Sequence, residues 1–140
     1  MKMLQRTFFF LMLAVLPTLS FAQHNIQVEV DQVPNSDGNI NIALYNTDSS
    51  FLNTESAFYS MSVNATEGTT TLVLSDIPKG TYAIALYHDE DANNELKTNW
   101  LGIPKEKVAF SKAKMKTFGP PKYKECSFEV AKDVQLKISL

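Results

Sequence analysis

Short runs of alternating apolar and polar residues follow one another along the chain after residue 22. Residues 26–30 (IQVEV) alternate, and residues 40–45 (INIALY) alternate again after the turn-rich segment 35–39 (NSDGN). A period of two residues is typical of a β-strand with one buried face. The two runs and the short polar segment between them therefore predict a β-hairpin.

The same alternation recurs to the end of the chain, while a helical period is nearly absent. It predicts further strands at residues 59–63, 70–76, 81–89, 107–111, 126–130 and 134–140. Residues 51–58 are the one place where a helical turn is expected. Segment 81–89 is the best central strand, because Tyr82, Ile84 and Leu86 share one face and small alanines occupy the other.

Seven or eight short strands, spaced by about ten residues, indicate an all-β fold. We expect an antiparallel β-sandwich of about seven strands with Greek-key connections, and an up-and-down barrel is the alternative. The Cys–Trp–Cys spacing of antibody domains is absent, so a likeness to immunoglobulin domains is one of architecture only.

The first 22 residues have the pattern of a cleaved secretory signal. Lys2 and Arg6 precede an uncharged apolar run at residues 8–16, and residues 20–22 (SFA) place small side chains before a cut after Ala22. The alternative is a membrane anchor, but the run is short for a span of about 20 residues. A lipoprotein would need cysteine after the cut, where Gln23 stands. We expect a secreted or periplasmic protein of one domain, residues 23–140.

Charge narrows the class of partner. The chain has 13 basic and 15 acidic residues, so loss of Lys2 and Arg6 leaves 11 against 15 and a net charge of −4. A weakly acidic protein is not expected to bind nucleic acid, because phosphate recognition needs a basic surface. No second apolar stretch approaches the length of a membrane span. The basic run Lys112, Lys114 and Lys116 is expected to lie in solvent.

Residues suited to catalysis are few. The single cysteine, Cys126, excludes an internal disulfide and is expected to be a buried small hydrophobic residue of a strand. His24 and His88 are the only histidines, which is a poor set for zinc. No G-x-S-x-G motif occurs. A non-enzymatic protein is therefore the prediction, with a hydrolase assembled in space as a remaining alternative.

Residues 88–106 (HDEDANNELKTNWLGIPKE) contain the strongest chemical pattern. Asp89, Asp91 and Asn93 alternate like the first, third and fifth residues of a calcium-binding loop, and Glu95 falls where a backbone carbonyl would be the ligand. Calcium prefers six to eight oxygen ligands, and side chains in this pattern on a tight loop can converge on one point.

Two positions of that pattern argue against an EF-hand. Asn94 stands where glycine is expected, although asparagine tolerates the left-handed conformation, and Trp100 stands where a bidentate glutamate is expected. The metal hypothesis that fits these residues is a looser calcium loop with Glu90, Glu95 or Glu106 as an additional ligand. The alternative is a solvated acidic turn, stabilised by Asn and Asp side chains that bond to the backbone.

Aromatic residues cluster in the C-terminal half of the sequence: Tyr87, Trp100, Phe110, Phe118 and Tyr123. If exposed near the polar loop, they could stack on a sugar or a peptide. The alternative is that they anchor the core and the loops, since aromatic side chains dominate burial in small β domains.

The segment from residue 77 to 130 resembles the bacterial family known as domain of unknown function 2141 (DUF2141). The shared features are the IPKG turn, the strand ending in HDED, and the later LGIP, FS and FGPPKY motifs. The resemblance implies an exported sandwich, similar to immunoglobulin-like or transthyretin-like domains, and no known activity. The residues that it marks are His88, Asp89, Glu90, Asn93, Gly102, Pro104, Glu106, Phe110, Ser111, Phe118 and Pro121.

This chain departs from the family pattern at Asn94, where glycine is common, and at Thr98, where aspartate is common. Both departures weaken a calcium site. A binding or accessory domain of the cell envelope, with an unknown ligand or protein partner, is therefore the leading prediction, because loops at one end of a sandwich commonly carry binding. Its candidate residues are His88, Asp89, Glu90, Trp100, Glu106, Phe118 and Tyr123.

The second hypothesis is a structural module stabilised by calcium, with Asp89, Asp91, Asn93 and Glu95 as tentative metal ligands. No other cofactor is expected. The third hypothesis is a hydrolase of the cell envelope.

Overall fold

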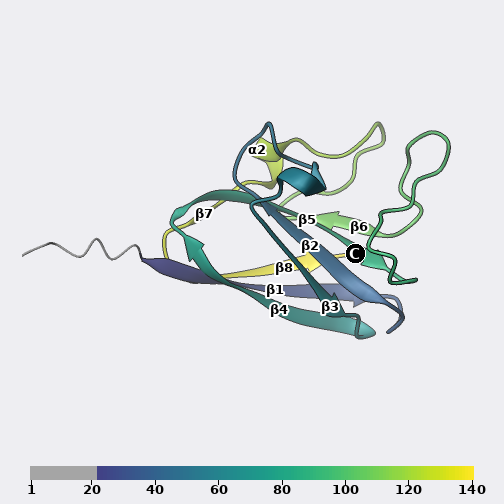
Figure 1. Ribbon diagram of the computed structural model, residues 1–140, viewed down its shortest axis with the longest axis horizontal. Coiled ribbons are helices and arrows are strands. Elements are labelled where there is room, and N and C mark those ends of the chain that lie inside the picture. Colours follow the sequence, from purple (N-terminus) through teal and green to yellow (C-terminus); the bar gives the residue numbers. More distant parts are fainter. Residues whose placement is uncertain (1–21) are drawn as a thin grey trace, which may run out of the picture.

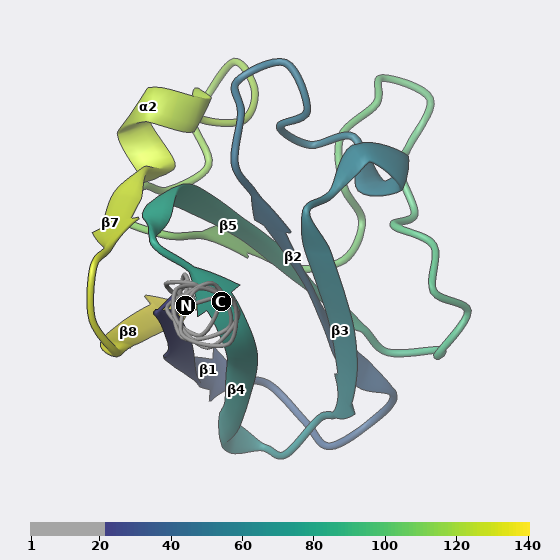
Figure 2. The same ribbon diagram turned by 60° about the vertical axis from the view of Figure 1, so that its left-hand side comes forward.

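Two β-sheets face each other in the computed structural model, which describes residues 22–140. The predicted leader lies outside the described residues except for Ala22. One sheet has the order β4–β1–β8, formed by Gly68–Pro78, Gln23–Val33 and Val134–Ser139. The other has the order β3–β2–β5–β6, formed by Tyr59–Asn64, Asn39–Tyr45, Gly80–Asp89 and Val108–Phe110, and β7 (Phe128–Val130) pairs with the start of β5. Figures 1 and 2 show the two layers.

The core lies between the two layers because the strands alternate as predicted. Ile26, Val28 and Val30 of β1 are fully buried, and Ile84 and Leu86 of β5 meet them from the other sheet. Burial of each large aliphatic side chain stabilises the fold by about 1.5–3 kcal/mol. The all-β, sandwich-like fold is confirmed, with eight strands where about seven were expected.

The predicted hairpin between residues 26–30 and 40–45 is wrong. Both runs are strands, but β1 pairs with β4 and β8, whereas β2 pairs with β3 and β5. The turn-rich segment between them carries the chain from one sheet to the other. Alternation fixes which face of a strand is buried and does not choose its neighbour. The β1–β8 pair is also parallel, within an otherwise antiparallel arrangement.

Two short helices interrupt the strands. The 3-10 helix η2 (Thr54–Ser56) confirms the expected helical turn. The helix α2 (Tyr123–Cys126) was not predicted, and it makes Cys126 the end of a helix, while the strand begins at Phe128. A local bond explains the helix, since the Glu125 carboxylate accepts from the Lys122 backbone N at 2.7 Å. No helix found between residues 22 and 140 has the length and apolar character that crossing a bilayer requires.

Ser111 is a buried junction between β5 and α2. Its Oγ accepts a hydrogen bond from the Ile84 backbone N at 2.9 Å and donates one to the Cys126 carbonyl at 2.6 Å. Its own backbone N donates to the Ile84 carbonyl at 3.0 Å. One hydroxyl therefore pairs two buried backbone groups that lie far apart in the sequence. The burial expected for the Cys126 side chain is confirmed, and it raises the pKa of this thiol to about 11.

Gly38 holds the β1–β2 connection against the end of β5. Its φ is +62°, and a Cβ atom added there would lie 1.9 Å from the Asp89 carbonyl oxygen and 2.8 Å from atoms of Glu90. Glycine is required on both counts, because a side chain would be strained and would clash with backbone. This contact fixes the point at which the loop 90–107 leaves the sheet.

The variant Ser111→Ala is expected to lower the free energy of unfolding by about 2–4 kcal/mol, because it leaves a buried N–H and a buried C=O without partners. Urea denaturation measures the change. Ser62→Ala, at an exposed position of β3, is the control and is expected to have little effect. If the two variants had equal free energies of unfolding, the role of the Ser111 hydroxyl in joining β5 to α2 would be contradicted.

The variant Gly38→Ala is expected to cost about 2–4 kcal/mol of stability, the sum of left-handed strain and the backbone clash. Gly68→Ala separates the two effects, since Gly68 has a φ of +84° and no atom within 4 Å of an added Cβ. It should show the strain alone, about 1–2 kcal/mol. Thermal and urea unfolding measure the loss of stability. If Gly38→Ala and Gly68→Ala lost the same amount, the close approach of Gly38 to the Asp89 backbone would be refuted.

Candidate functional site: an apolar groove beside an acidic loop

The outer face of β5 points away from the core and carries the site. Ala85, Tyr87 and Asp89 lie on this face, because they alternate with the inward-facing Ile84 and Leu86. The loop 90–107 leaves the end of β5 and returns to β6, and the loop 111–122 leaves β6 beside Ala85, near the middle of β5. Figure 1 shows both loops extending beyond the sheet. Side chains of both loops line one groove together with Ala85 and Tyr87.

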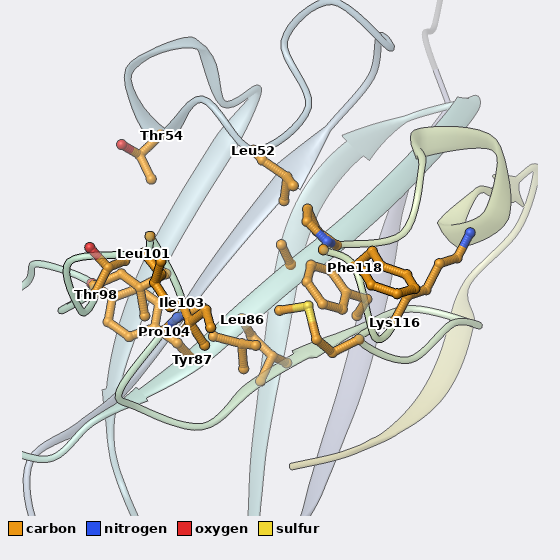
Figure 3. Close-up of a pocket in the computed structure, with 18 of the residues that line it drawn as sticks. Leu52, Thr54, Leu86, Tyr87, Thr98, Leu101, Ile103, Pro104, Lys116 and Phe118 are labelled. Carbon is orange, nitrogen blue, oxygen red and sulfur yellow. The ribbon is translucent and has the colours of Figure 1, made fainter.

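The groove has a volume of about 530 Å³, which lies within the usual range for small-molecule sites. Most of its lining is apolar, and Figure 3 shows these side chains around the opening. From the sheet come Tyr45, Ala85, Tyr87, Val108 and Phe110, and from the loops come Leu52, Leu96, Leu101, Ile103, Pro104, Met115, Phe118 and Pro120. The pattern of alternation could not show this groove, because most of the lining comes from loops.

The rim of the groove exposes large apolar side chains. Phe118 is 101% exposed, and Leu101 and Ile103 are 60% and 55% exposed. Trp100, a predicted binding residue, is 90% exposed at the tip of the same loop but does not line the groove. The two loops therefore present aromatic and aliphatic groups to solvent at neighbouring points.

Tyr123, also a predicted binding residue, has a different environment. Its hydroxyl donates to the Thr81 carbonyl at 3.0 Å, and its ring packs edge-on against Phe51 with 5.8 Å between ring centroids. Phe51 packs in turn against Tyr45. Tyr123 thus anchors α2 and the 46–57 segment to the sheet, and it lies outside the groove lining.

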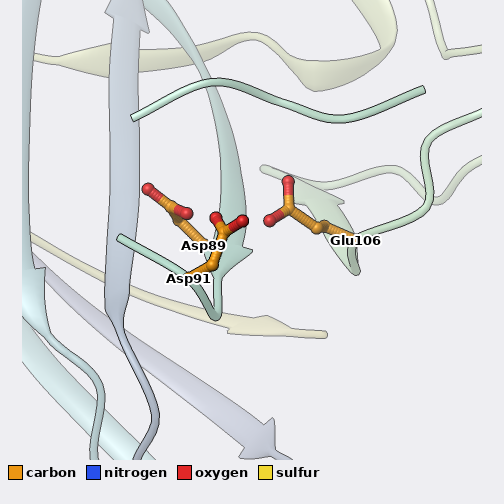
Figure 4. Close-up of side chains that lie close together, drawn as sticks. All are labelled: Asp89, Asp91 and Glu106. Atoms are coloured by element: carbon orange, nitrogen blue, oxygen red, sulfur yellow. The ribbon is translucent and has the colours of Figure 1, made fainter. Parts of the chain in front are cut away.

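Three carboxylates converge at the end of β5, as Figure 4 shows. Oxygen atoms of Asp89, Asp91 and Glu106 all lie within 4.8 Å of one another. Asp89 is fully buried, Glu106 is half-buried and Asp91 is exposed. Sequence reasoning included all three among its candidates, but only the structure brings Glu106 next to the two aspartates.

Asp89 organises the loop around its carboxylate. Its oxygens accept hydrogen bonds from the backbone N of Asn93 at 3.2 Å, from the backbone N of Asn94 at 2.7 Å and from Asn41 Nδ2 at 3.0 Å. Asn94 has a φ of +61°, the left-handed conformation that its place in the calcium pattern requires. Residues 89–94 therefore form the tight turn that the calcium pattern predicts. The backbone N–H groups of this turn point at the Asp89 carboxylate.

The remaining predicted ligands do not join the three carboxylates. Asn93 donates from Nδ2 to Asp91 at 3.1 Å, and its Oδ1 accepts from the Glu95 backbone N at 2.8 Å. Glu95 is exposed and lies outside the cluster of three. These contacts are side-chain bonds that stabilise a turn.

Lys97 neutralises part of this acidic cluster, and sequence reasoning did not single it out. Its ammonium donates to the Asp91 carboxylate, and its backbone N donates to Glu106 Oε2 at 3.1 Å. The hydrogen bond from Lys97 lowers the pKa of Asp91, and the same bond raises the pKa of Lys97. The only signal in the sequence was a single cation within an acidic segment.

A polar bridge joins the groove to the acidic cluster. Asn41 Nδ2 donates to the Tyr87 hydroxyl and to Asp89 Oδ2, both at 3.0 Å. Tyr87 lines the groove, and burial raises its pKa. The Asn41 side chain therefore contacts both the groove and the cluster.

His88 and Glu90 lie apart from both features. His88 is 1% exposed on the inner side of β5, and its Nε2 is 2.7 Å from the Asp37 carbonyl oxygen. Glu90 Oε1 is 3.8 Å from His88 Nδ1 and accepts from Asn35 Nδ2 at 3.3 Å. His24 is 3.9 Å from an Asp133 carboxylate oxygen. Neither histidine lines the groove.

Comparison with known proteins identifies the family but no activity. A search of curated proteins and a search of solved structures each gave no significant match. Residues 28–138 match the profile of the family described as "Uncharacterized protein conserved in bacteria". This match spans most of the chain and confirms the resemblance seen in the motifs. The chain therefore belongs to the bacterial family DUF2141.

Proposed function

We propose that this chain is a non-enzymatic binding protein and that the apolar part of its ligand occupies the groove. The observation that carries the proposal is the set of apolar side chains exposed on its rim, above all Phe118, Leu101 and Ile103. Single exposed apolar residues are ordinary, but a contiguous group around a concave site is typical of a binding surface.

The energetics favour an occupant. Removing apolar surface from water contributes about 25 cal/mol per Å², and complete burial of one phenylalanine contributes about 1.5–3 kcal/mol. Phe118 contributes almost none of this to folding, because its side chain is fully exposed. A ligand that covers Phe118, Leu101 and Ile103 would gain the stabilisation that the folded chain leaves unused.

The groove favours an uncharged apolar group. Its only lining charge is Lys116, whose ammonium donates to Glu125 at 2.6 Å and 2.7 Å. The other lining side chains with a polar group carry hydroxyls: Tyr45, Thr54, Tyr87, Thr98 and Thr117. Since the Tyr87 hydroxyl accepts from Asn41, its own proton is free to donate to a ligand oxygen.

The side chains that would be needed for covalent catalysis are placed in structural roles, which supports the non-enzymatic proposal. Cys126 is buried with a raised pKa of about 11, so its thiolate is scarce at neutral pH. The Ser111 hydroxyl is occupied by two backbone groups. With the leader cleaved after Ala22, the protein would act in the periplasm or outside the cell, on a ligand or partner of the envelope.

Binding of N-phenyl-1-naphthylamine, an uncharged fluorescent apolar probe, tests the groove directly. We expect saturable binding with a rise in probe fluorescence, because the probe leaves water for an apolar lining. The double variant Ile103→Glu/Met115→Glu should weaken binding at least tenfold, since a charge in the groove must be desolvated.

The matched control is Val73→Glu, which adds a charge at an apolar residue of similar exposure to Met115 but on β4 of the other sheet. It should leave probe binding unchanged. Circular dichroism checks that all variants fold. Absence of saturable binding, or the same affinity in the groove variant and the control, would refute the proposal.

A calcium-stabilised module is the second candidate, supported by the convergence of Asp89, Asp91 and Glu106 within 4.8 Å. Within residues 22–140, Asn41 Oδ1 is a buried atom without a hydrogen-bond partner. Rotation of that amide would turn an oxygen toward Asp89 in place of Nδ2. Calcium would also have to displace the Lys97 ammonium from Asp91. Carboxylate and amide oxygens are the ligands that calcium prefers.

Calcium at a hundredfold excess over its Kd should stabilise the fold by about 2.7 kcal/mol, seen as a higher Tm that a chelator reverses. Glu106→Gln should abolish the shift, and the exposed Glu95→Gln is the matched control that should retain it. Lys97→Met should strengthen calcium binding, because it removes the competing cation. An unchanged Tm of both the natural chain and Lys97→Met at millimolar calcium would exclude this candidate.

A further inference from the structure

The basic residues are concentrated in one segment of an acidic protein. Eight of the 13 basic residues of the chain fall within residues 97–124, where Glu106 is the only acid. The rest of the segment 22–140 has three lysines and 14 acids. Residues 97–124, which include the later part of the loop 90–107 and all of the loop 111–122, are therefore strongly positive, while the rest of the described chain, including the acidic start of the first loop, is strongly negative.

The same loops carry the exposed apolar tips. Lys105 and Lys107 follow Trp100, Leu101 and Ile103 in one loop. In the other loop, exposed lysines stand on both sides of Phe118, at residues 112, 114, 116, 122 and 124. Because both loops line one groove, these groups belong to one face of the molecule, over the outer side of β5.

Most of these charges are available to a partner. Among the described residues, the ion pairs of this region join Lys97 to Asp91 and Lys116 to Glu125. The other six lysines of the segment have no carboxylate within 4 Å in residues 22–140, and all are exposed: Lys105, Lys107, Lys112, Lys114, Lys122 and Lys124.

We propose that this face of the protein docks on the surface of an anionic lipid bilayer. The tips at Trp100, Leu101 and Phe118 enter the interface, and the six free lysines contact the headgroups. The proposal deepens the proposed function and rests on it in one respect: the apolar group that enters the groove is then a lipid acyl chain. Association of this kind requires no spanning helix.

The combination of side chains favours a bilayer over other partners. Tryptophan is enriched at membrane interfaces, where its ring meets apolar chains and its N–H meets water. Lysine is depleted at the centre of protein–protein interfaces, whereas here lysines alternate with the apolar tips. Single-stranded nucleic acid would need stacking platforms, which Leu101, Ile103 and Met115 cannot provide.

The electrostatic contribution of the lysines to vesicle binding is large enough to detect. Each lysine close to an anionic leaflet raises partitioning by about fivefold at low ionic strength, and the effect falls within a Debye length. Insertion of the Trp100 ring adds the burial of one large aromatic surface. Binding should therefore depend on anionic lipid, on salt and on the tip residue together.

The experiment uses the mature chain and large vesicles of phosphatidylcholine with or without phosphatidylglycerol. Trp100 is the only tryptophan, and it is 90% exposed, so its emission reports directly on the tip. We expect co-sedimentation with anionic vesicles, a blue shift of emission, and quenching by lipids brominated on the acyl chain. Neutral vesicles should show at least tenfold weaker binding.

Two double variants separate the effect of local charge on binding from the effect of overall charge. Lys112→Gln/Lys114→Gln should weaken binding to anionic vesicles by about 30-fold. The control, Lys79→Gln/Lys132→Gln, removes the same charge next to the β4–β5 and β7–β8 turns and should change binding less than about twofold. Trp100→Ser should weaken binding at least tenfold, measured by sedimentation. Unchanged Tm values show that the variants fold.

The proposal is overturned if anionic vesicles do not bind at low salt, if neutral and anionic vesicles bind equally, or if the two lysine pairs have the same effect. The naphthylamine probe, used without vesicles, keeps the two proposals apart. Probe binding without vesicle binding would refute docking and leave the groove intact as a ligand site. Vesicle binding without probe binding would support docking and refute the proposed function.

Discussion

The hydrogen bonds of the buried Asp89 carboxylate are the interaction on which the groove and the loop beside it depend. This carboxylate lies at the last position of β5, fully shielded from water, where an ionised group is stable only with several donors. Asn41 of the neighbouring strand supplies one donor, and the backbone of residues 93 and 94 supplies two more. The loop must therefore curl back over Asp89 before it can extend, and Gly38 closes the other side of this turn. These hydrogen bonds to the Asp89 carboxylate set the direction of the loop. They therefore also set the position of one wall of the groove.

The two faces of β5 separate the core from the groove. Its inner face contributes Tyr82, Ile84 and Leu86 to the core, where burial stabilises the sandwich. Its outer face has alanine at positions 83 and 85, which leaves space above the sheet. Phe110 and Cys126 fill the part of that space near Ala83, and the groove occupies the part near Ala85 and Tyr87. A larger residue at Ala85 would fill the groove without any change in the core.

Alternation predicted the strands and their buried faces well, because burial of one face is a property of each segment alone. It failed for strand partners, as β1 and β2 show, because pairing depends on where the connecting segment travels. The loop was singled out as the place for chemistry, and the structure brings Asp89, Asp91 and Glu106 together at its two ends, while the left-handed Asn94 follows from its pattern. Lys97 and the groove were missed for a common reason. Both depend on how residues 96–104 and 115–120 fold back on the sheet, and irregular loops have no period from which this could be predicted.

Opposite charges are separated along one loop, and this links the two candidate sites. The loop begins with carboxylates that converge at Asp89 and continues into lysines that flank exposed apolar tips. Lys97 stands at the boundary, and its ammonium belongs to the acidic side because it bonds to Asp91. A divalent cation at the cluster would release that ammonium toward the basic side, whereas an anionic surface would attract it away from Asp91 and uncover the carboxylates. Each event favours the other, because both replace the ion pair between Lys97 and Asp91, so the two kinds of binding would reinforce one another.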